Sequence, residues 1–281
     1  MTAVIDDNVN ALERLVAFDL ETTGLSAEKD RIVEVGAVRF NRAGDEIDRF
    51  QSLVNPRRPI PQRVQWIHGI SDADVADAPE IGPVLQAFLG WIGPPEGTAL
   101  LAHNARFDAA FLGAELGRNG LAMPGHHVID TLPLARKCWP EFRGHGLDAL
   151  ADRLGLDSSG KHRALADSLR VRALWLAIEA AGQFEGPRVR YAIGDPSRSE
   201  LVPQGWEALT EAARSGRLVL LEYTGGSRGP APRTIAPRRF EHRGGLVYVV
   251  AFCHADRKEK AFRLDRIQRF EVLETVAAPP A

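Results

Sequence analysis

Two carboxylates interrupt an apolar stretch near the start of the chain, in the segment AFDLETTGL at residues 17–25. Asp19 and Glu21 lie two residues apart, and side chains two apart on a strand point to the same face. Like charges so placed repel each other, and burying them is costly unless something positive lies between them. The pair therefore predicts a bound cation.

Two further stretches bring acids to the edges of apolar elements: LAHNARFD ends at Asp108, and KHRALADS contains Asp167. Four carboxylates in one cleft would bind hard divalent cations, Mg²⁺ or Mn²⁺, through oxygen. Two such cations about 4 Å apart can clamp an in-line phosphoryl displacement, one activating the attacking water and the other stabilising the leaving oxygen. We expect His162, on the loop before a helix, to accept the proton of that water.

The elements that must position these residues are strands and helices in alternation. We expect strands near 16–20, 31–40 and 46–54 as an antiparallel meander, followed by buried strands at 98–103 and 126–130. Apolar residues at helical spacing follow each later strand. The predicted fold class is therefore α/β, with a mixed sheet flanked by helices.

A segment rich in glycine and proline, residues 183–205, predicts a linker between two domains, 12–182 and 206–276. After one helical pattern, the second domain has strand-like stretches separated by glycine-rich turns, which is typical of a small β-barrel. Residues 186–281 carry a net charge of +5, whereas residues 1–185 carry −7. The basic C-terminal part favours contact with nucleic acid.

Composition excludes several classes of protein. No apolar run approaches the roughly 20 residues of a membrane helix, and the first ten residues lack the basic start and apolar core of a signal peptide. The two cysteines, far apart in sequence, offer neither a disulfide framework nor a zinc pattern. We therefore expect a cytoplasmic protein without a membrane partner, and the sequence leaves its oligomeric state open.

Three motifs in order, FDLETTGL, HNARFD and HRALAD, resemble those of the DnaQ-like 3′–5′ exonucleases, in the DEDDh subgroup with four acids and a histidine. WIHGISDADVADAP resembles the His-Gly-Ile segment of the same family, and the resemblance covers about residues 12–182. It implies a ribonuclease H-like fold. It also implies a two-metal exonuclease that releases nucleoside monophosphates from single-stranded 3′ ends.

The same resemblance implies a role for each matching residue. The metal ligands are Asp19, Glu21, Asp108 and Asp167, with His162 as the general base. The substrate-binding residues are Thr22, Thr23, Leu25, His68, Ile70, Asn104 and Phe107. The residue types alone give His103 and Asn104 a structural role, because asparagine is a favoured N-cap and a helix is expected to begin near Ala105.

The C-terminal stretches RTIAPRRF, LVYVVAFC and KAFRLDRIQRF resemble the WYL domain, a small Sm-like β-barrel, over about residues 206–275. The Trp-Tyr-Leu signature of that family reads Val247-Tyr248-Val249 here. The resemblance implies these residues for binding nucleic acid or another ligand: Arg233, Tyr248, Arg263 and Arg266. Arginines near a tyrosine can pair with phosphates and stack on bases, and a solvated arginine rim is the alternative.

Three functions of different classes stay open. We favour a stand-alone repair or turnover exonuclease on single-stranded DNA, with RNA as the alternative substrate because no motif reads the 2′ position. A catalytically silent nucleic-acid-binding regulator would not need the full set of acids, and a polymerase-associated proofreading subunit would not need a WYL-like domain. A nucleotide-binding phosphate loop is rejected, because GLDSSGKH ends in His162 instead of a hydroxyl residue and follows a helix.

Overall fold

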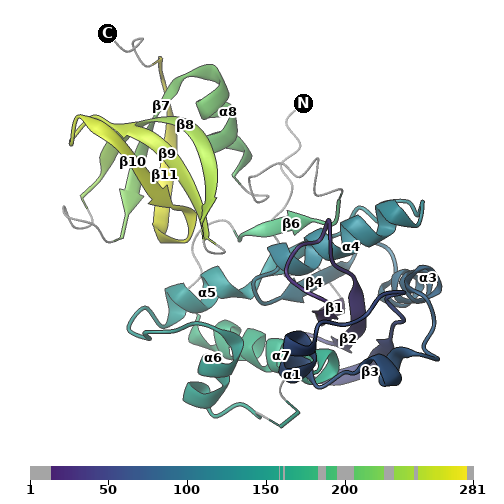
Figure 1. The fold of residues 1–281 in the computed structure, drawn as a ribbon. Helices are drawn as coiled ribbons and strands as arrows, with labels where there is room; N and C mark the ends of the chain where they lie inside the picture. The colour runs from purple at the N-terminus through teal and green to yellow at the C-terminus, as the bar shows by residue number, and fades with distance from the viewer. Residues whose placement is uncertain are drawn as a thin grey trace. The chain divides into compact units, whose positions relative to one another are not determined.

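The computed structural model describes residues 14–157, 159–160, 162–182, 188–194, 206–224, 231–243 and 246–276. These residues divide into two compact units, which we describe separately (Figure 1). The first unit holds residues 14–182 and a strand near residue 190, and the second holds residues 206–276. No helix in this described part of the chain has both the length and the apolar character that crossing a bilayer requires.

The first unit is built on a six-stranded mixed sheet with the order β3-β2-β1-β4-β5-β6. Its strands are β1 (Arg14–Thr22), β2 (Ile32–Phe40), β3 (Glu46–Leu53), β4 (Thr98–Ala102), β5 (His127–Asp130) and β6 (Arg190–Ala192). The first three form the expected antiparallel meander, and β4 and β5 continue the sheet in parallel with β1. This sheet confirms the predicted α/β fold class.

Helices cover both faces of this sheet (Figure 1). The helices of this unit are α1 (Gln62–His68), α2 (Asp72–Val75), α3 (Ile81–Ile92), α4 (Arg106–Arg118), α5 (Thr131–Cys138), α6 (Leu147–Leu154) and α7 (Ala164–Ala181). Val16, Phe18 and Leu20 of β1 join residues of α3 and α4 in one apolar core. Because successive side chains alternate, Asp19 and Glu21 lie on the opposite face, where α7 packs on β1 and β2.

The first turn of α7 lies against the sheet at Gly36, which is the register partner of Asp19 on β2. A Cβ atom at this position would lie 2.1 Å from the backbone nitrogen of Leu165. Any side chain here would push the helix away, because real Cβ contacts are never this short. The glycine therefore allows the first turn of α7 to lie beside the two acids of β1.

Part of the predicted linker belongs to the first sheet. Residues Arg190–Ala192 form β6 and pair with β5, and Ile193, only 3% exposed, joins the apolar core. The strand forms because it pairs with the edge of β5, which is far away in sequence. The local glycine and proline content predicts a linker here and gives no sign of that pairing. Residues 183–187 and 195–205 of the predicted linker lie outside the described residues.

The second unit is a five-stranded antiparallel sheet with the order β10-β9-β8-β7-β11, as expected for the C-terminal domain. Its strands are β7 (Arg217–Tyr223), β8 (Arg233–Arg243), β9 (Leu246–Cys253), β10 (Lys258–Arg263) and β11 (Ile267–Val276). Helix α8 (Glu207–Ser215) packs on β7 and β8. A short 3₁₀ turn, η2 (Leu264–Arg266), joins β10 to β11.

Candidate active site

Three of the predicted acids lie together where β1 meets the start of α7. Carboxylate oxygens of Asp19, Glu21 and Asp167 all lie within 4.8 Å of one another. Strand β1 supplies the first two, and the first turn of α7 supplies the third. Divalent cations take oxygen ligands about 2.0–2.6 Å away, so oxygens this close can share one cation. We call these three residues the carboxylate cluster.

The fourth acid, Asp108, lies beside this cluster but outside it. It stands in the first turn of α4 and is 2% exposed. Its charge is the largest contribution from any neighbouring charge to the raised pKa of Asp19. Among the described residues, its buried Oδ1 has no hydrogen-bond partner. A buried polar atom left unpaired costs about 1–3 kcal/mol, and coordination of a cation would satisfy it.

Burial and mutual repulsion disfavour ionisation of the cluster. Burial raises the pKa of Asp19 well above its ordinary value, and the neighbouring acids add to the effect. Burial, followed by repulsion from Asp167, raises the pKa of Glu21 to about 8. Burial also raises the pKa of Asp167, although Arg170 opposes it. Carboxylates in this state ionise when a cation neutralises them, so the donor set fits Mg²⁺ or Mn²⁺.

A further buried carboxylate, Glu34, secures the start of α7. It accepts hydrogen bonds from Arg163 Nε (3.1 Å) and Nη2 (2.8 Å), from Gln51 Nε2 (2.8 Å) and from the Ala164 backbone N–H (3.0 Å). Burial would raise the pKa of Glu34, but these hydrogen bonds outweigh it and the pKa is lowered. Glu34 thus fixes to β2 the helix that carries Asp167.

The predicted general base, His162, lies two residues before α7 and adopts a left-handed backbone conformation with φ of 58°. Such a conformation is uncommon for a residue other than glycine and persists where the surroundings enforce it. The His162 backbone N–H donates to the Asp167 carboxylate. The half-exposed ring has its Nε2 atom 3.7 Å from Asp148 Oδ2. The structure therefore brings His162 to the edge of the carboxylate cluster.

The predicted capping role of Asn104 is wrong. The N-cap residue of α4 is Ala105, and no side chain caps this helix. Asn104 has φ of 62°, whereas a capping side chain needs extended backbone. Its backbone N–H donates to Asp130 Oδ1 at 3.0 Å, which fixes the turn before α4. Phe107, beyond this turn, is partly buried with its ring 4.7 Å from that of Phe111.

The preceding residue, His103, has the structural role expected of it. Its Nδ1 atom lies 3.0 Å from Thr131 Oγ1, and its Nε2 atom lies 2.7 Å from the His145 carbonyl oxygen. Burial lowers the pKa of His103 to about 4, so the ring is neutral near pH 7. His103 therefore links the end of β4 to α5 and to the loop before α6.

The last residue of β1 and the turn after it hold three predicted substrate-binding residues. Thr22 Oγ1 donates to the Gly24 carbonyl at 2.6 Å, and Thr23 Oγ1 donates to Asp30 Oδ1 at 3.3 Å. Both threonines are buried. Leu25, in contrast, is 81% exposed. The threonine hydroxyls thus shape the turn, and the leucine extends into solvent beyond it.

Helix α1 ends at His68, which is buried. Burial lowers the pKa of His68, and its Nδ1 atom accepts a hydrogen bond from the Ile70 backbone N–H at 3.0 Å. Ile70 is 2% exposed and packs in an apolar cluster beneath α1 and α2, so it faces the interior and not solvent. Trp66 and Ile67 stand in the WIHGIS stretch but were not among the predicted site residues, and they are 77% and 57% exposed. Their place directly before His68 could have pointed to them.

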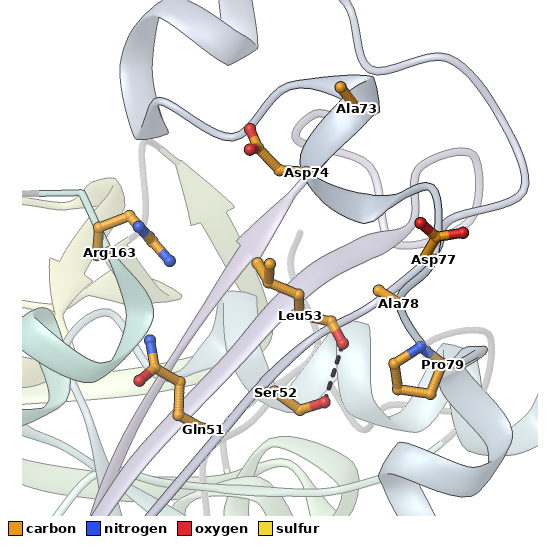
Figure 2. Close-up of a pocket in the computed structure, with 9 residues that line it drawn as sticks. All are labelled: Gln51, Ser52, Leu53, Ala73, Asp74, Asp77, Ala78, Pro79 and Arg163. Atoms are coloured by element: carbon orange, nitrogen blue, oxygen red, sulfur yellow. Dashed lines mark hydrogen bonds between the residues drawn. The ribbon is translucent and has the colours of Figure 1, made fainter.

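A pocket of about 550 Å³ lies between the end of β3 and α2 (Figure 2). It is lined by Gln51, Ser52, Leu53, Ala73, Asp74, Asp77, Ala78, Pro79 and Arg163. None of the four predicted metal ligands lines it. Gln51 and Arg163, which also bind Glu34, extend to its wall, so the pocket borders the support of α7 and not the carboxylate cluster.

Three charged residues that organise the site were absent from the sequence analysis: Glu34, Asp148 and Arg170. Glu34 interrupts the apolar strand RIVEVGAVRF much as the two acids interrupt β1. Arg170 is 2% exposed in α7, and its guanidinium binds Asp167. A charged residue inside an otherwise apolar segment was the available signal for the first of them.

The second unit brings together three of its four predicted ligand-binding residues. Arg263 and Tyr248 are register partners on β10 and β9. The Arg263 backbone N–H donates to Tyr223 Oη at 3.3 Å, and the guanidinium of Arg233, 4% exposed, lies 5.7 Å from the same tyrosine ring. Arg266 is exposed in η2, and its carbonyl oxygen accepts a hydrogen bond from the backbone N–H of Thr224, the residue after Tyr223, at 3.0 Å.

Comparison with known proteins identifies both units. The profile of the exonuclease family (RNase T) matches residues 16–174, and that of the WYL domain matches residues 205–272. The PolC-type DNA polymerase III of Bacillus cereus is 40% identical over 204 residues, which cover 68% of this chain. The corresponding protein of Bacillus subtilis is 38% identical over 176 residues. The chain spans only 14% and 12% of the length of these two relatives.

Solved structures agree in fold. Escherichia coli exonuclease I in complex with a dA16 oligonucleotide has a TM-score of 0.60 at 17% identity, over 85% of this chain and 55% of that one. Cell-death related nuclease 4 has a TM-score of 0.54 at 16% identity, over 61% of this chain and 65% of that one. The chain belongs to the RNase T exonuclease family and carries a WYL domain after its exonuclease domain.

Proposed function

We propose that the chain is a divalent-metal-dependent 3′–5′ exonuclease that shortens single-stranded DNA and releases nucleoside monophosphates. The observation that carries this proposal is the carboxylate cluster, with Asp108 and its unpaired oxygen beside it. Membership of the exonuclease family supports nuclease chemistry at this cluster. We assign the activity to a domain at residues 12–182 and substrate contact to a domain at residues 206–276.

The four acids Asp19, Glu21, Asp108 and Asp167 would hold two cations, Mg²⁺ or Mn²⁺. Bound cations of this kind neutralise phosphate charge and make water more acidic. The chain contributes rigid placement of the acids, because β1 lies inside the sheet and Glu34 holds the start of α7. Pre-positioned charges need no rearrangement when the reaction begins, which is where electrostatic catalysis gains most.

The role of His162 is to accept the proton of the attacking water at a ring nitrogen. An imidazole is the side chain best suited to this task near neutral pH. The half-exposed ring and the hydrogen bond from the His162 backbone N–H to the Asp167 carboxylate support the assignment. A general base contributes about 10²–10⁴-fold to the rate. Replacing His162 by alanine should therefore lower kcat on this scale and leave the concentration of Mn²⁺ needed for half-maximal activity unchanged.

The 3′-terminal nucleotide would lie against the apolar side chains beside the cluster. Leu25, Trp66 and Ile67 are among the most exposed large apolar residues of the described chain. Trp66 and Ile67 directly precede the buried His68 at the end of α1. Apolar and aromatic side chains hold bases with little sequence preference, which suits an enzyme that degrades any single strand.

The WYL domain would bind the same strand farther from the reacting end. Arg233, Tyr248 and Arg263 approach one another around Tyr223, and arginine can contact phosphates while tyrosine stacks on bases. Each lost phosphate contact lowers the log–log salt slope by about 0.7 for single strands. Arg266→Ala and Arg263→Ala should each weaken binding and flatten this slope without changing kcat at saturating substrate. If the salt slope is unchanged in both variants, these arginines do not contact the phosphates of the strand.

A second candidate is the editing of newly made 3′ ends beside a polymerase, which the PolC-type relatives favour. An editing enzyme should remove a mismatched 3′ nucleotide from a primer–template faster than a paired one. A stand-alone enzyme of repair or turnover should instead prefer the free single strand. Rates on matched substrates of the two kinds separate the candidates.

The proposal is tested with DNA and RNA oligonucleotides labelled at the 5′ end, single- and double-stranded, in Mg²⁺ or Mn²⁺. We expect a ladder of labelled products that shortens step by step, with single-stranded DNA degraded fastest. Asp77→Asn is the matched control for Asp19→Asn, because Asp77 is an exposed acid outside the cluster. Immediate release of the labelled mononucleotide would mean that digestion starts at the 5′ end. Equal activity in Asp19→Asn and Asp77→Asn would mean that the carboxylate cluster is not the active site.

A further inference from the structure

A buried arginine lies behind the carboxylate cluster. Arg170 is 2% exposed, and its Nη1 atom binds Asp167 Oδ1. Its Nε atom donates to the Asp157 carbonyl at 3.0 Å, and Nη2 donates to the Ser159 carbonyl at 2.7 Å. One guanidinium therefore holds both the start of α7 and the chain that leads to His162.

The same guanidinium reaches the His162 ring through one acid. Asp148, in the first turn of α6, has Oδ1 4.0 Å from Arg170 Nη1 and Oδ2 3.7 Å from His162 Nε2. The Asp148 side chain is 43% exposed, so the arginine is the buried and better fixed partner of the two. The acid thus lies between the arginine and the histidine ring.

The conformation of His162 requires such support. Its φ of 58° is uncommon for a residue with a side chain, and Gly160, two residues earlier, also has a positive φ. A strained residue of this kind keeps its conformation only when several contacts fix it. The described contacts are the hydrogen bond from the His162 backbone N–H to Asp167 and the contact of the ring with Asp148. Arg170 contacts both of these acids.

A simple counter-ion for Asp167 would not need this arrangement. A lysine ammonium could neutralise one carboxylate, whereas the planar guanidinium offers five N–H donors in a fixed fork. Arg170 directs Nε and Nη2 to backbone carbonyls of the loop and not to acids. Those two bonds order the chain before His162, independently of the charge on Asp167.

We propose that Arg170 is a positioning residue for His162, acting through Asp148, Asp167 and the carbonyl groups of Asp157 and Ser159. The proposal rests on the proposed function only where it takes His162 as the general base. The guanidinium touches neither substrate nor reacting atoms. It fixes the loop and the acid that hold the histidine in its strained conformation.

The test is a double-mutant cycle on a 5′-labelled single strand at saturating Mn²⁺. Arg170→Met should lower kcat about 10–100-fold, within the range of general-base catalysis, and change KM less than about twofold. In the His162→Ala background the same substitution should change kcat less than about twofold, because residues acting as one unit are not additive. Arg170→Lys should give an intermediate kcat.

The matched control is Arg172→Met on the same helix, since Arg172 packs over Phe40 and bonds the Gly44 carbonyl instead of the loop. Its kcat should equal that of the wild type. An equal loss in Arg172→Met, an equal loss from Arg170→Met in both backgrounds, or no loss in either background would overturn the proposal.

Hydrogen exchange gives a reading that does not need nuclease activity. The backbone amides of Ser159, Gly160 and His162 should exchange at least about tenfold faster in Arg170→Met than in Arg172→Met. If Arg170→Met does not fold, Arg170→Lys replaces it in the same comparison. Unchanged exchange would overturn the proposal whether or not the chain cleaves DNA. A wild-type chain without nuclease activity would refute the proposed function alone.

Discussion

Two glutamates face each other across β1 and β2 and behave in opposite ways. Glu21 and Glu34 are direct register partners, so both side chains lie on the face of the sheet that α7 covers. The pKa of Glu21 is raised to about 8, mainly by burial, and that of Glu34 is lowered. The two residues are of the same type, lie on paired strands and are covered by the same helix. The difference between their pKa values must therefore come from the neighbouring side chains.

The neighbours of Glu34 are donors and those of Glu21 are acids. Glu34 accepts hydrogen bonds from Arg163, Gln51 and the Ala164 backbone, whereas Glu21 lies within 4.8 Å of two other carboxylates. A buried charge supplied with donors stabilises one packing arrangement. A partly buried charge surrounded by like charges is stabilised when a cation binds. The surroundings of Glu34 are those of a structural network, and the surroundings of Glu21 are those expected of a cation-binding site.

The largest expected effect is on activity, and it belongs to the carboxylate cluster. Asp19→Asn should lower kcat/KM by about 10³-fold or more, because it removes one of the charges on which electrostatic stabilisation of the transition state depends. The metal-free protein should unfold at the same or a higher temperature, since a repelling charge is lost. Steady-state kinetics and thermal unfolding in a chelator measure the two effects. If Asp19→Asn loses stability and keeps activity, the carboxylate of Asp19 has a structural role and not a catalytic one.

The next effect is on stability, and it belongs to Glu34. Glu34→Gln should lower the free energy of unfolding by about 2–3 kcal/mol, because a neutral amide replaces the charged acceptor of Arg163 and cannot accept all four hydrogen bonds. The half-exposed Arg163 can regain water, which keeps the loss below that for a fully buried pair. Urea unfolding measures it. A loss under 0.5 kcal/mol, the scale of ordinary surface substitutions, would show that this network does not hold α7.

The smallest effect is on the pH dependence of stability. The raised pKa of Glu21 means that the folded chain disfavours its ionised form. The stability of the metal-free protein should therefore be fully present below the ordinary pKa of 4.5 and fall as pH rises toward 8. After allowance for solvent screening, the loss relative to Glu21→Gln should be about 1–2 kcal/mol.

Urea unfolding of the wild type and Glu21→Gln in a chelator, between pH 5 and 8, isolates this effect from other titrating groups. Saturating Mn²⁺ should abolish the pH-dependent difference, because the cation favours the ionised carboxylate. Parallel stability curves for the two proteins across this range would mean that Glu21 ionises freely without a cation.

Local sequence was sufficient for the elements that carry the acids. The alternation of apolar residues around Asp19 and Glu21 predicts a strand with both acids on one face, and β1 is that strand. The strand at β6 was missed because it forms only by pairing with β5, far away in sequence. The capping role given to Asn104 failed because the backbone there is left-handed, which Asp130 enforces from another strand.

The sequence spacing of the four acids does not predict which three form the carboxylate cluster and which one lies beside it. That division depends on how the helices pack on the sheet. Asp167 reaches Asp19 because Gly36 admits the first turn of α7, whereas Asp108 stands on α4 outside the group. The function of Glu34 was hidden for a related reason. Its role appears only when the face of β2 covered by α7 is known, since the donors come from β3 and α7.

The most direct test of the central claim is calorimetric titration of Mn²⁺ into the wild type, Asp19→Asn, Asp167→Asn and Glu34→Gln at pH 8. We expect the wild type to bind Mn²⁺ and both aspartate variants to bind it at least about tenfold more weakly, a loss of about 1.4 kcal/mol. Glu34→Gln should keep more affinity than either, because its side chain supports α7 without joining the cluster. Equal Mn²⁺ affinity in the wild type and both aspartate variants would contradict the assignment of the carboxylate cluster as a metal site.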